Sequence, residues 1–300
     1  MEMNELKKKI YKIFIRIINH ISPLIGSKII YKMKFKKKLN LKNPQKFNEK
    51  LMWLKLKKYN KNPIVWKCSD KYQMREYALN HGVEEKNLVK LIGVYDDVKD
   101  INWDELPQKF AIKCTHGCGF NIICNDKAKF DIPSAEKQLA KWLKTKFGYE
   151  TAEIHYTKVK PKIICEEFIE NDKGVLPTDY KFYCFNGEPK IVLVCTERNI
   201  STKADFFDLD WNVLELRDDN TSTLNAKEVL KKPAHFDKML EISRNVSKDF
   251  EFVRIDFYEY DNNAILGEMT FTPASCMAYY SKEGDKLLSD LLVIDEANKK

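Results

Sequence analysis

The stretch "FVRIDFYEYDNNAILGEMTFTPAS" runs from Phe252 to Ser275. Two runs of β-forming residues flank an Asp-Asn-Asn segment, a pattern typical of a β-hairpin. If residues 261–263 form a three-residue loop, antiparallel pairing places Asp256 directly opposite Glu268. Like charges opposed in this way repel each other. The pair therefore predicts either a protonated acid or a cation bound between the two carboxylates.

Arg254 and Thr270 fall on the same face of this predicted hairpin. A two-residue loop would shift the register by one residue and remove the opposition of the two acids. Two acids on a solvent-exposed sheet face are the alternative interpretation. The hairpin by itself leaves these interpretations open.

An apolar strand with a lysine near its end, "FAIKC", comes before the glycine-containing loop "THGCGF". Lys113 can meet phosphates there, and a loop with Gly117 and Gly119 can bring backbone N–H groups close to them. The loop lacks the Gly-Lys-Ser/Thr ending of a Walker A motif. The alternative for Lys113 is a surface lysine.

A pair of acids, Glu166 and Glu167, directly follows the apolar start of "IICEEFIE". The edge of such a strand can hold an adenine base through backbone groups, while a side chain fixes the ribose. An acidic pair at the start of a helix is the alternative.

The order of these features resembles the TupA-like branch of the ATP-grasp superfamily, named for teichuronopeptide biosynthesis. The stretches that carry the resemblance are "SDKYQMREY", "LPQKFAIKCTHGCGFNII", "PKIICEEFIE", "TDYKFYCFNGEPKIV" and "VRIDFY…ILGEMTFTPAS", across roughly residues 44–280. The resemblance implies an α+β ATP-grasp fold in which two α+β lobes clamp the nucleotide. It also implies activation of a carboxylate as an acyl phosphate, which an amine then attacks.

The resemblance also implies residue roles. ATP would be bound by Lys71, Lys113, Thr115, Gly117, Gly119, Glu166, Glu167, Ile169 and Asp179, with the phosphates at Lys71, Lys113 and the loop 115–120, and the adenine along 166–169. Mg2+ would be held by Asp256, Glu268 and Thr270, and Lys181 and Arg254 are the candidate catalytic cations. Thr270 stands where many ATP-grasp enzymes have an asparagine, and Cys276 stands where a glycine is expected.

The charge of the chain is concentrated at its start. Residues 1–42 hold 12 Lys or Arg against two Glu, a balance of +10, so the remaining residues sum to −2 of the total of +8. Leu6, Ile10, Ile13, Phe14, Ile17 and Ile21 form one helical stripe, with the basic residues mostly off it. The interpretations are a helix packed on the main domain with a solvated basic face, or peripheral attachment to an anionic membrane. We expect residues 1–42 to form this basic segment and 43–300 the catalytic domain, with the lobe boundary near 165–170.

Composition limits the other possibilities. The share of charged residues, 32%, argues against a membrane-spanning chain, and no nucleic-acid-binding module accompanies the basic segment. No secretory signal is recognisable, so we expect a cytoplasmic location and eight reduced, mostly buried cysteines.

Three rival interpretations remain. Asp208 and Asp210 form a DxD, the metal-binding pair of many glycosyltransferases, although "FFDLDWNV" also fits a hairpin turn with Trp211 packed back. Cys114, His116, Cys118 and Cys124 cluster in sequence without the paired spacing usual for zinc. A non-catalytic membrane-associated scaffold is the third. We expect an ATP- and Mg2+-dependent carboxylate–amine ligase acting on small-molecule or glycan-linked substrates in surface polysaccharide synthesis.

Overall fold

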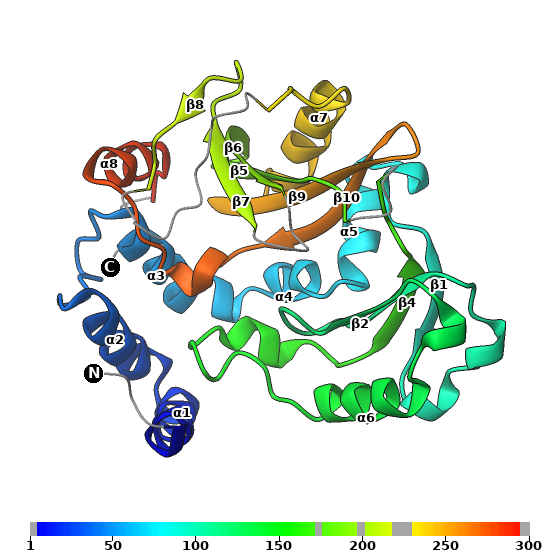
Figure 1. Ribbon diagram of the computed structural model, residues 1–300. Coiled ribbons are helices and arrows are strands. Elements are labelled where there is room, and N and C mark those ends of the chain that lie inside the picture. Colours follow the sequence, from blue (N-terminus) through cyan, green and yellow to red (C-terminus); the bar gives the residue numbers. More distant parts are fainter. Residues whose placement is uncertain (1–4, 172–175, 197–201, 218–229, 295–300) are drawn as a thin grey trace.

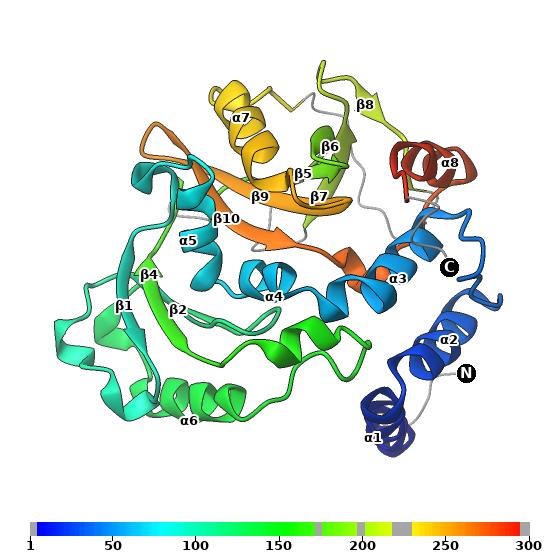
Figure 2. The ribbon, with the colours of Figure 1, turned by 180° about the vertical axis from the view of Figure 1, so that it is seen from behind.

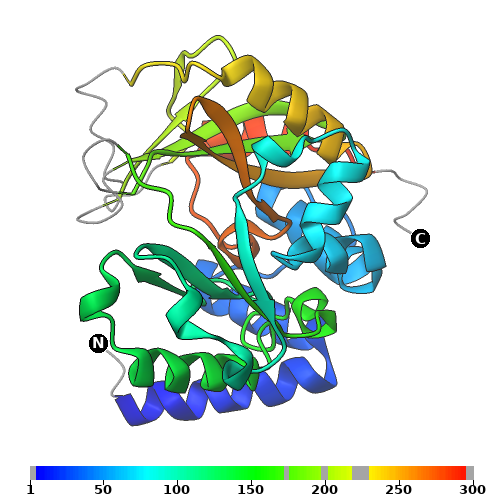
Figure 3. The same ribbon diagram turned by 90° about the vertical axis from the view of Figure 1, so that its right-hand side faces the viewer.

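The computed structural model describes residues 5–171, 176–196, 202–217 and 230–294, so the first four residues of the predicted basic segment lie outside it. Two antiparallel sheets, one of four strands and one of six, lie at the centre of two lobes (Figure 1). Helices α4 and α5 lie between the sheets, while α7 and α6 cover their outer sides (Figures 1 and 3). The architecture is the mixed α+β arrangement expected from the sequence.

The small lobe is built on the sheet β1-β4-β2-β3. Its strands are β1 (Leu91–Tyr95), β2 (Phe110–Cys114), β3 (Asn121–Cys124) and β4 (Ile163–Glu167), and α6 (Ile132–Leu143) covers it. Its core is separate from that of the large lobe and includes Phe110, Ile112, Leu139 and Ile163. Figure 2 shows the same lobe from behind, with the chain running from β4 toward the large sheet.

The large lobe is built on the sheet β10-β9-β5-β6-β7-β8. Its strands are β5 (Asp179–Phe185), β6 (Glu188–Thr196), β7 (Lys203–Phe207), β8 (Val213–Leu214), β9 (Phe252–Tyr260) and β10 (Asn263–Thr270), with α7 (Phe236–Ser247) outside. The β5–β6 turn is Asn186-Gly187, and both residues have positive φ. The lobe boundary near 165–170 stays a prediction; it overlaps the end of β4.

Helices α1 (Glu5–Ile21), α2 (Pro23–Phe35), α3 (Phe47–Lys57), α4 (Pro63–Ser69), α5 (Gln73–Asn80) and α8 (Lys282–Leu291) complete the chain. Ser69 ends α4, and Asp70 accepts bonds from the backbone N–H groups of Tyr72 and Gln73 ahead of α5. Asp131 caps α6 and accepts a bond from the backbone N–H of Ser134. In each case a carboxylate accepts from backbone N–H groups that have no partner within the helix. None of the helices in the described ranges has the length and apolar character that crossing a bilayer requires.

Candidate active site

The β9–β10 hairpin brings the two predicted metal ligands together by a route that the sequence did not indicate. Its turn has two residues, Asp261 and Asn262, both with positive φ, so the predicted three-residue loop is wrong. Continued unbroken, this register would place Gly267 opposite Asp256. A β-bulge at Gly267 shifts the pairing by one residue, and Asp256 faces Glu268 after all.

The bulge also decides which way Glu268 points. Before it, Ala264 and Leu266 belong to the large hydrophobic core; after it, Met269 and Phe271 do. Side chains alternate between the faces of a strand, so this change of parity needs one extra residue. Gly267 is that residue, and Glu268 therefore shares a face with Thr270 rather than entering the core.

Asp256 is surrounded by cations of the protein itself. Its carboxylate oxygens accept two bonds of 2.7 Å from Nε and Nη2 of Arg254, and Lys181 Nζ lies 2.7 Å from Oδ2. Burial alone would raise the pKa of Asp256, but Arg254 and Lys181 lower it overall. The Asp256 carboxylate is therefore ionised, and the protein itself supplies the charge that balances it.

Lys181 lies between two acids. Its Nζ is 2.5 Å from Asp179 and 2.7 Å from Asp256, and all three side chains are largely buried. Burial favours the neutral amine, but the two carboxylates together raise the pKa of Lys181 above its usual value. Arg254 Nη2 also donates to Thr270 Oγ1 at 3.1 Å, so the candidate catalytic cations and metal ligands form one connected network.

Lys71 connects the lobes at this network. Its Nζ lies 3.2 Å from Oε1 of Glu268 in the large lobe and donates to the carbonyl oxygen of Gly117 in the small lobe at 2.6 Å. The predicted phosphate loop therefore lies next to the predicted metal carboxylate. Gly119, with φ of 74° and open space around its Cα, lies on the exposed part of this loop.

Thr115 differs from the other predicted phosphate contacts. Its side chain is fully buried, and its hydroxyl accepts a bond from the Lys162 backbone N–H at 3.3 Å. Its backbone N–H also donates to the Lys162 carbonyl. In this structure the threonine anchors the start of the loop, and its side chain does not reach the cleft.

Lys113 and Glu166 form a second charged pair on the small sheet. Lys113 Nζ lies 2.6 Å from Glu166 Oε2, and the glutamate side chain is buried. Beside them is a small cavity of about 110 Å³ between the lobes. Its lining includes Ala111, Lys113, Asn121, Ile123, the linker residues Glu167, Phe168 and Ile169, and Tyr258 of β9. This lining places Lys113 and the linker, the expected phosphate and adenine contacts, around one space.

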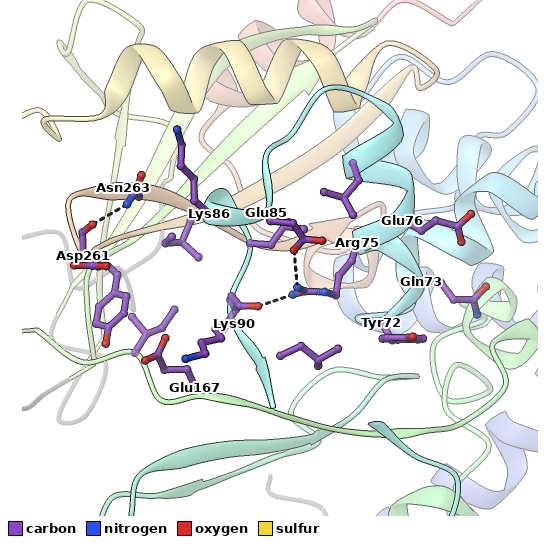
Figure 4. Close-up of a pocket in the computed structure, with 17 residues that line it drawn as sticks. Tyr72, Gln73, Arg75, Glu76, Glu85, Lys86, Lys90, Glu167, Asp261 and Asn263 are labelled. Carbon is purple, nitrogen blue, oxygen red and sulfur yellow. Dashed lines mark hydrogen bonds and ion pairs between the residues drawn. The ribbon is translucent and has the colours of Figure 1, made fainter. Parts of the chain in front are cut away.

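A larger cavity, of about 820 Å³, lies on the other side of the linker (Figure 4). Among the proposed site residues, only Glu167 and Ile169 line it. Arg75 on its wall donates to the carbonyl oxygen of Val89 at 2.6 Å and lies 3.6 Å from Glu85, so it ties α5 to the start of β1. The smaller cavity adds Lys113 to the same linker residues, so it is the candidate space for the nucleotide, whereas Asp256, Glu268, Lys181 and Arg254 line neither cavity.

Sequence reasoning gave one residue of this region a different role and missed another. His116 Nε2 lies 3.1 Å from the carbonyl oxygens of both Trp142 and Thr145, so the buried ring ties the phosphate loop to the end of α6. Burial lowers its pKa and keeps the imidazole neutral. Glu153 is buried and accepts bonds from Thr272 and Ser275, directly after β10. The Cys/His cluster pointed to His116 only as a zinc ligand, and no motif marks Glu153, because each acts through contacts distant in sequence.

The Asp208/Asp210 pair and the Cys/His cluster, the two rival sites, both lie in the described part of the chain. Asp208 accepts bonds from the backbone N–H and the side-chain amide of Asn212, at 2.8 and 2.9 Å, within the β7–β8 turn. Trp211 stacks on Phe207 at 4.5 Å, as the hairpin interpretation predicted. Within the described part of the chain no group of three or more His, Cys, Asp or Glu could hold a metal, so the zinc cluster is not formed. All eight cysteines are unbridged, and all but Cys118 are buried.

Comparison with known proteins identifies the family. The model of the family described as "TupA-like ATPgrasp" matches residues 49–293. The chain belongs to this family. The α+β ATP-grasp fold expected from the sequence is thereby confirmed. A search of curated proteins gives no match.

Among solved structures, the TupA-like chain is similar to D-alanine–D-alanine ligase from Bacillus anthracis, with 17% identity and a TM-score of 0.46, over 75% of this chain and 66% of that one. It is also similar to L-amino acid ligase from Bacillus licheniformis, with 12% identity and a TM-score of 0.43, over 70% and 44%. A third is the ATP-grasp ligase PsnB complexed with minimal precursor, Mg and ADP, with 13% identity and a TM-score of 0.40, over 80% and 62%. The chain spans about half to two thirds of the length of these proteins.

The TupA-like site has a donor set suited to Mg2+. Asp256, Glu268 and Thr270 present only oxygen atoms, and Mg2+ in nucleotide sites commonly takes one or two carboxylates, with phosphates and water completing the shell. Two carboxylates alone cannot complete an octahedron, which agrees with a metal that arrives with a nucleotide. Cys276, where a glycine was expected, has φ of 63°, a conformation that glycine adopts without strain.

Proposed function

We propose that the protein is an ATP- and Mg2+-dependent carboxylate–amine ligase. The observation that carries this proposal is the arrangement around Asp256 and Glu268. Two carboxylates face each other across a hairpin, with Lys181 and Arg254 of the large lobe beside them and Lys71 reaching them from the segment next to the phosphate loop. A site that couples opposed acids to a set of cations suits a metal-bound polyphosphate.

The proposed ATP contacts other than the Thr115 side chain divide between the two lobes and the linker. Lys71 and Lys113 would neutralise phosphate oxygens, and the exposed backbone around Gly119 would cover them. Glu166, Glu167 and Ile169 would hold the base and ribose along the linker, and Asp179 would hold Lys181 in place. Because all of these cations pair with acids in this structure, phosphate binding would exchange carboxylate partners for phosphate partners.

The proposed reaction consists of two successive displacements. A carboxylate oxygen of the first substrate attacks the γ-phosphorus of ATP, the bond to the β–γ bridging oxygen breaks, and ADP leaves. The amine then attacks the carbonyl carbon of the acyl phosphate, inorganic phosphate leaves, and the amine loses a proton. Arg254 and Lys181 would stabilise the negative charge that develops on oxygen in both steps. Bound Mg2+ would neutralise phosphate charge and orient the transferred group.

The proposed substrates are an amino compound and a uronic or amino acid unit, free or glycan-linked, used in surface polysaccharide synthesis. This context comes from the family resemblance. The proposed location is the cytoplasm, at the inner face of the membrane. We propose no nucleic-acid partner.

The test measures ADP formed from ATP and Mg2+ with a panel of acids and amines. We expect ADP release that depends on both substrates, and a fall of about 100-fold or more in Lys113→Ala, the range seen for a lost electrostatic donor. Lys129→Ala, at an 85% exposed lysine side chain of the same lobe, is the matched control and should retain activity. Turnover of nucleotide sugars without ATP, abolished by Asp208→Ala, would contradict the ligase and favour the glycosyltransferase.

A further inference from the structure

The predicted apolar stripe of α1 faces solvent. Ile10, Ile13, Phe14 and Ile17 are between 52 and 60% exposed, and Ile21 is 78% exposed. Leu24 and Ile25 at the start of α2 continue this surface. Among the residues that the structure describes, the remaining exposed large apolar side chains are spread over the chain from Met33 to Val293. Seven exposed apolar side chains on sixteen consecutive residues form a patch of the kind that marks an interaction surface.

The stripe is exposed although α1 itself is packed against the rest of the chain. The other side of α1 buries Ile15 and Asn19, and Asn19 Nδ2 donates to the carbonyl oxygen of Tyr149 at 2.7 Å. A Cβ on Gly26 of α2 would lie 1.7 Å from Asn19 Oδ1, so α1 and α2 approach too closely for any larger residue. The helix therefore packs on the rest of the chain as one interpretation expected, but it does so through Ile15 and Asn19 and not through the stripe. A second face holds the helix, and the stripe points outward.

Basic side chains border the patch. Lys9 and Arg16 are exposed on α1 beside the stripe, Lys12 is exposed elsewhere on the same helix, and Lys28 and Lys32 are exposed on α2. No acid among the described residues lies between Leu6 and Lys42. A large apolar face bordered by cations alone complements a surface that is apolar inside and negatively charged outside.

We propose that α1 and the start of α2 bind the surface of an anionic bilayer, with the seven apolar side chains inserted among the acyl chains and the lysines at the headgroups. Figure 3 shows α1 lying along one outer edge of the molecule, where it can meet a flat surface lengthwise. A second copy of the chain would bring like charges together at the same border, so charge favours lipid over self-association. This inference stands independently of the reaction catalysed.

The test uses the full chain and vesicles of phosphatidylglycerol and phosphatidylcholine, or of phosphatidylcholine alone, in a sedimentation assay. We expect binding to the anionic vesicles at low salt, weakened by high salt. The triple variant Lys9→Gln, Lys12→Gln, Arg16→Gln should bind about 100-fold more weakly, since each basic residue near the surface contributes about fivefold. Phe14→Ser with Ile17→Ser should lose at least about tenfold.

Matched controls separate the patch from general changes in charge and hydrophobicity. The triple variant Lys129→Gln, Lys160→Gln, Lys286→Gln removes equal charge from other exposed sites, and Ile64→Ser with Val213→Ser removes two exposed apolar side chains elsewhere. Both should bind as the wild type does. Equal losses in controls and patch variants, or no vesicle binding at all, would overturn the proposal. The proposal would also be overturned if the wild type did not bind vesicles but formed a dimer in sedimentation velocity, and if Phe14→Ser with Ile17→Ser abolished that dimer.

Discussion

Asp256 and Glu268 face each other across β9 and β10, yet the protein balances their charges unequally. Asp256 is buried and contacts both Arg254 and Lys181, whereas the Glu268 side chain is 33% exposed and pairs with Lys71. The sequence alone suggested that this opposition requires a bound cation or a proton. The structure shows that the cations of the chain already balance it. The two acids should therefore respond differently to the same conservative change.

Glu268→Gln should abolish turnover and leave the folded protein nearly unchanged. The amide keeps the shape of the side chain, and a partly exposed ion pair contributes about 1 kcal/mol or less to the free energy of unfolding. Thermal melts with and without Mg-ATP, together with the ADP assay, measure both effects. We expect a melting temperature close to that of the wild type without nucleotide and a reduced shift with it. Retained turnover would show that Glu268 is not a metal ligand.

Asp256→Asn, in contrast, should destabilise the apo protein. Removing one partner of a buried charged group leaves Arg254 and Lys181 uncompensated, and such changes cost about 3–5 kcal/mol. Urea denaturation of this variant beside Glu268→Gln gives the comparison. Equal stability of the two variants would mean that the buried contacts of Asp256 with Arg254 and Lys181 make no net contribution to the free energy of unfolding.

The stability of the wild type relative to Asp256→Asn should depend on pH. The pKa of Asp256 is lowered in the folded protein, so its contribution is present above the unfolded-state value of about 3.9 and is lost as pH falls through the folded-state value. The difference in unfolding free energy between the two proteins should be constant above about pH 5 and shrink below about pH 4. A difference that grows on acidification would contradict the ionised state assigned to Asp256.

The hairpin shows how far sequence reasoning reaches. The opposed acids and their neighbours Arg254 and Thr270 could be predicted because alternation along a strand fixes which residues share a face. The length of the turn could not, since Asp261-Asn262 and Asp261-Asn263 are both plausible loops. The glycine within β10 was the available signal of a bulge, because glycine in a strand often marks one. Two errors of one residue, in the turn and in the bulge, cancelled.

Contacts between distant segments were beyond prediction. Periodicity correctly gave a helix at the start of the chain, but it could not tell which face would be buried. Asn19, rather than the apolar stripe, contacts Tyr149 of the main domain, and Gly26 lets α2 approach Asn19 closely. Thr115 was expected at the phosphates because its loop was, yet its hydroxyl is turned toward Lys162. Such side-chain orientations depend on packing that a single sequence does not show.

Glu153 holds a strained loop beside the candidate site. Ala274, Ser275 and Cys276 have positive φ in succession, a conformation that costs non-glycine residues energy and requires support from neighbours. Glu153 Oε1 accepts a bond from Thr272 at 2.5 Å and Oε2 one from Ser275 at 2.9 Å. This buried carboxylate joins the segment after β10 to the segment before β4, and thereby keeps the end of β10 and Thr270 in position.

We expect Glu153→Gln and Thr272→Val each to lower the free energy of unfolding by about 1–3 kcal/mol, the cost of leaving a buried polar partner unsatisfied. The two changes break the same bond, so their effects should be less than additive in the double variant. Both should also lower kcat more than they raise KM for ATP, since the bond supports Thr270 and not the adenine cavity. Glu150→Gln, at a nearby exposed acid, should change neither quantity. Fully additive losses, or kcat equal to that of the wild type in a destabilised Glu153→Gln, would mean that the loop is held by other contacts.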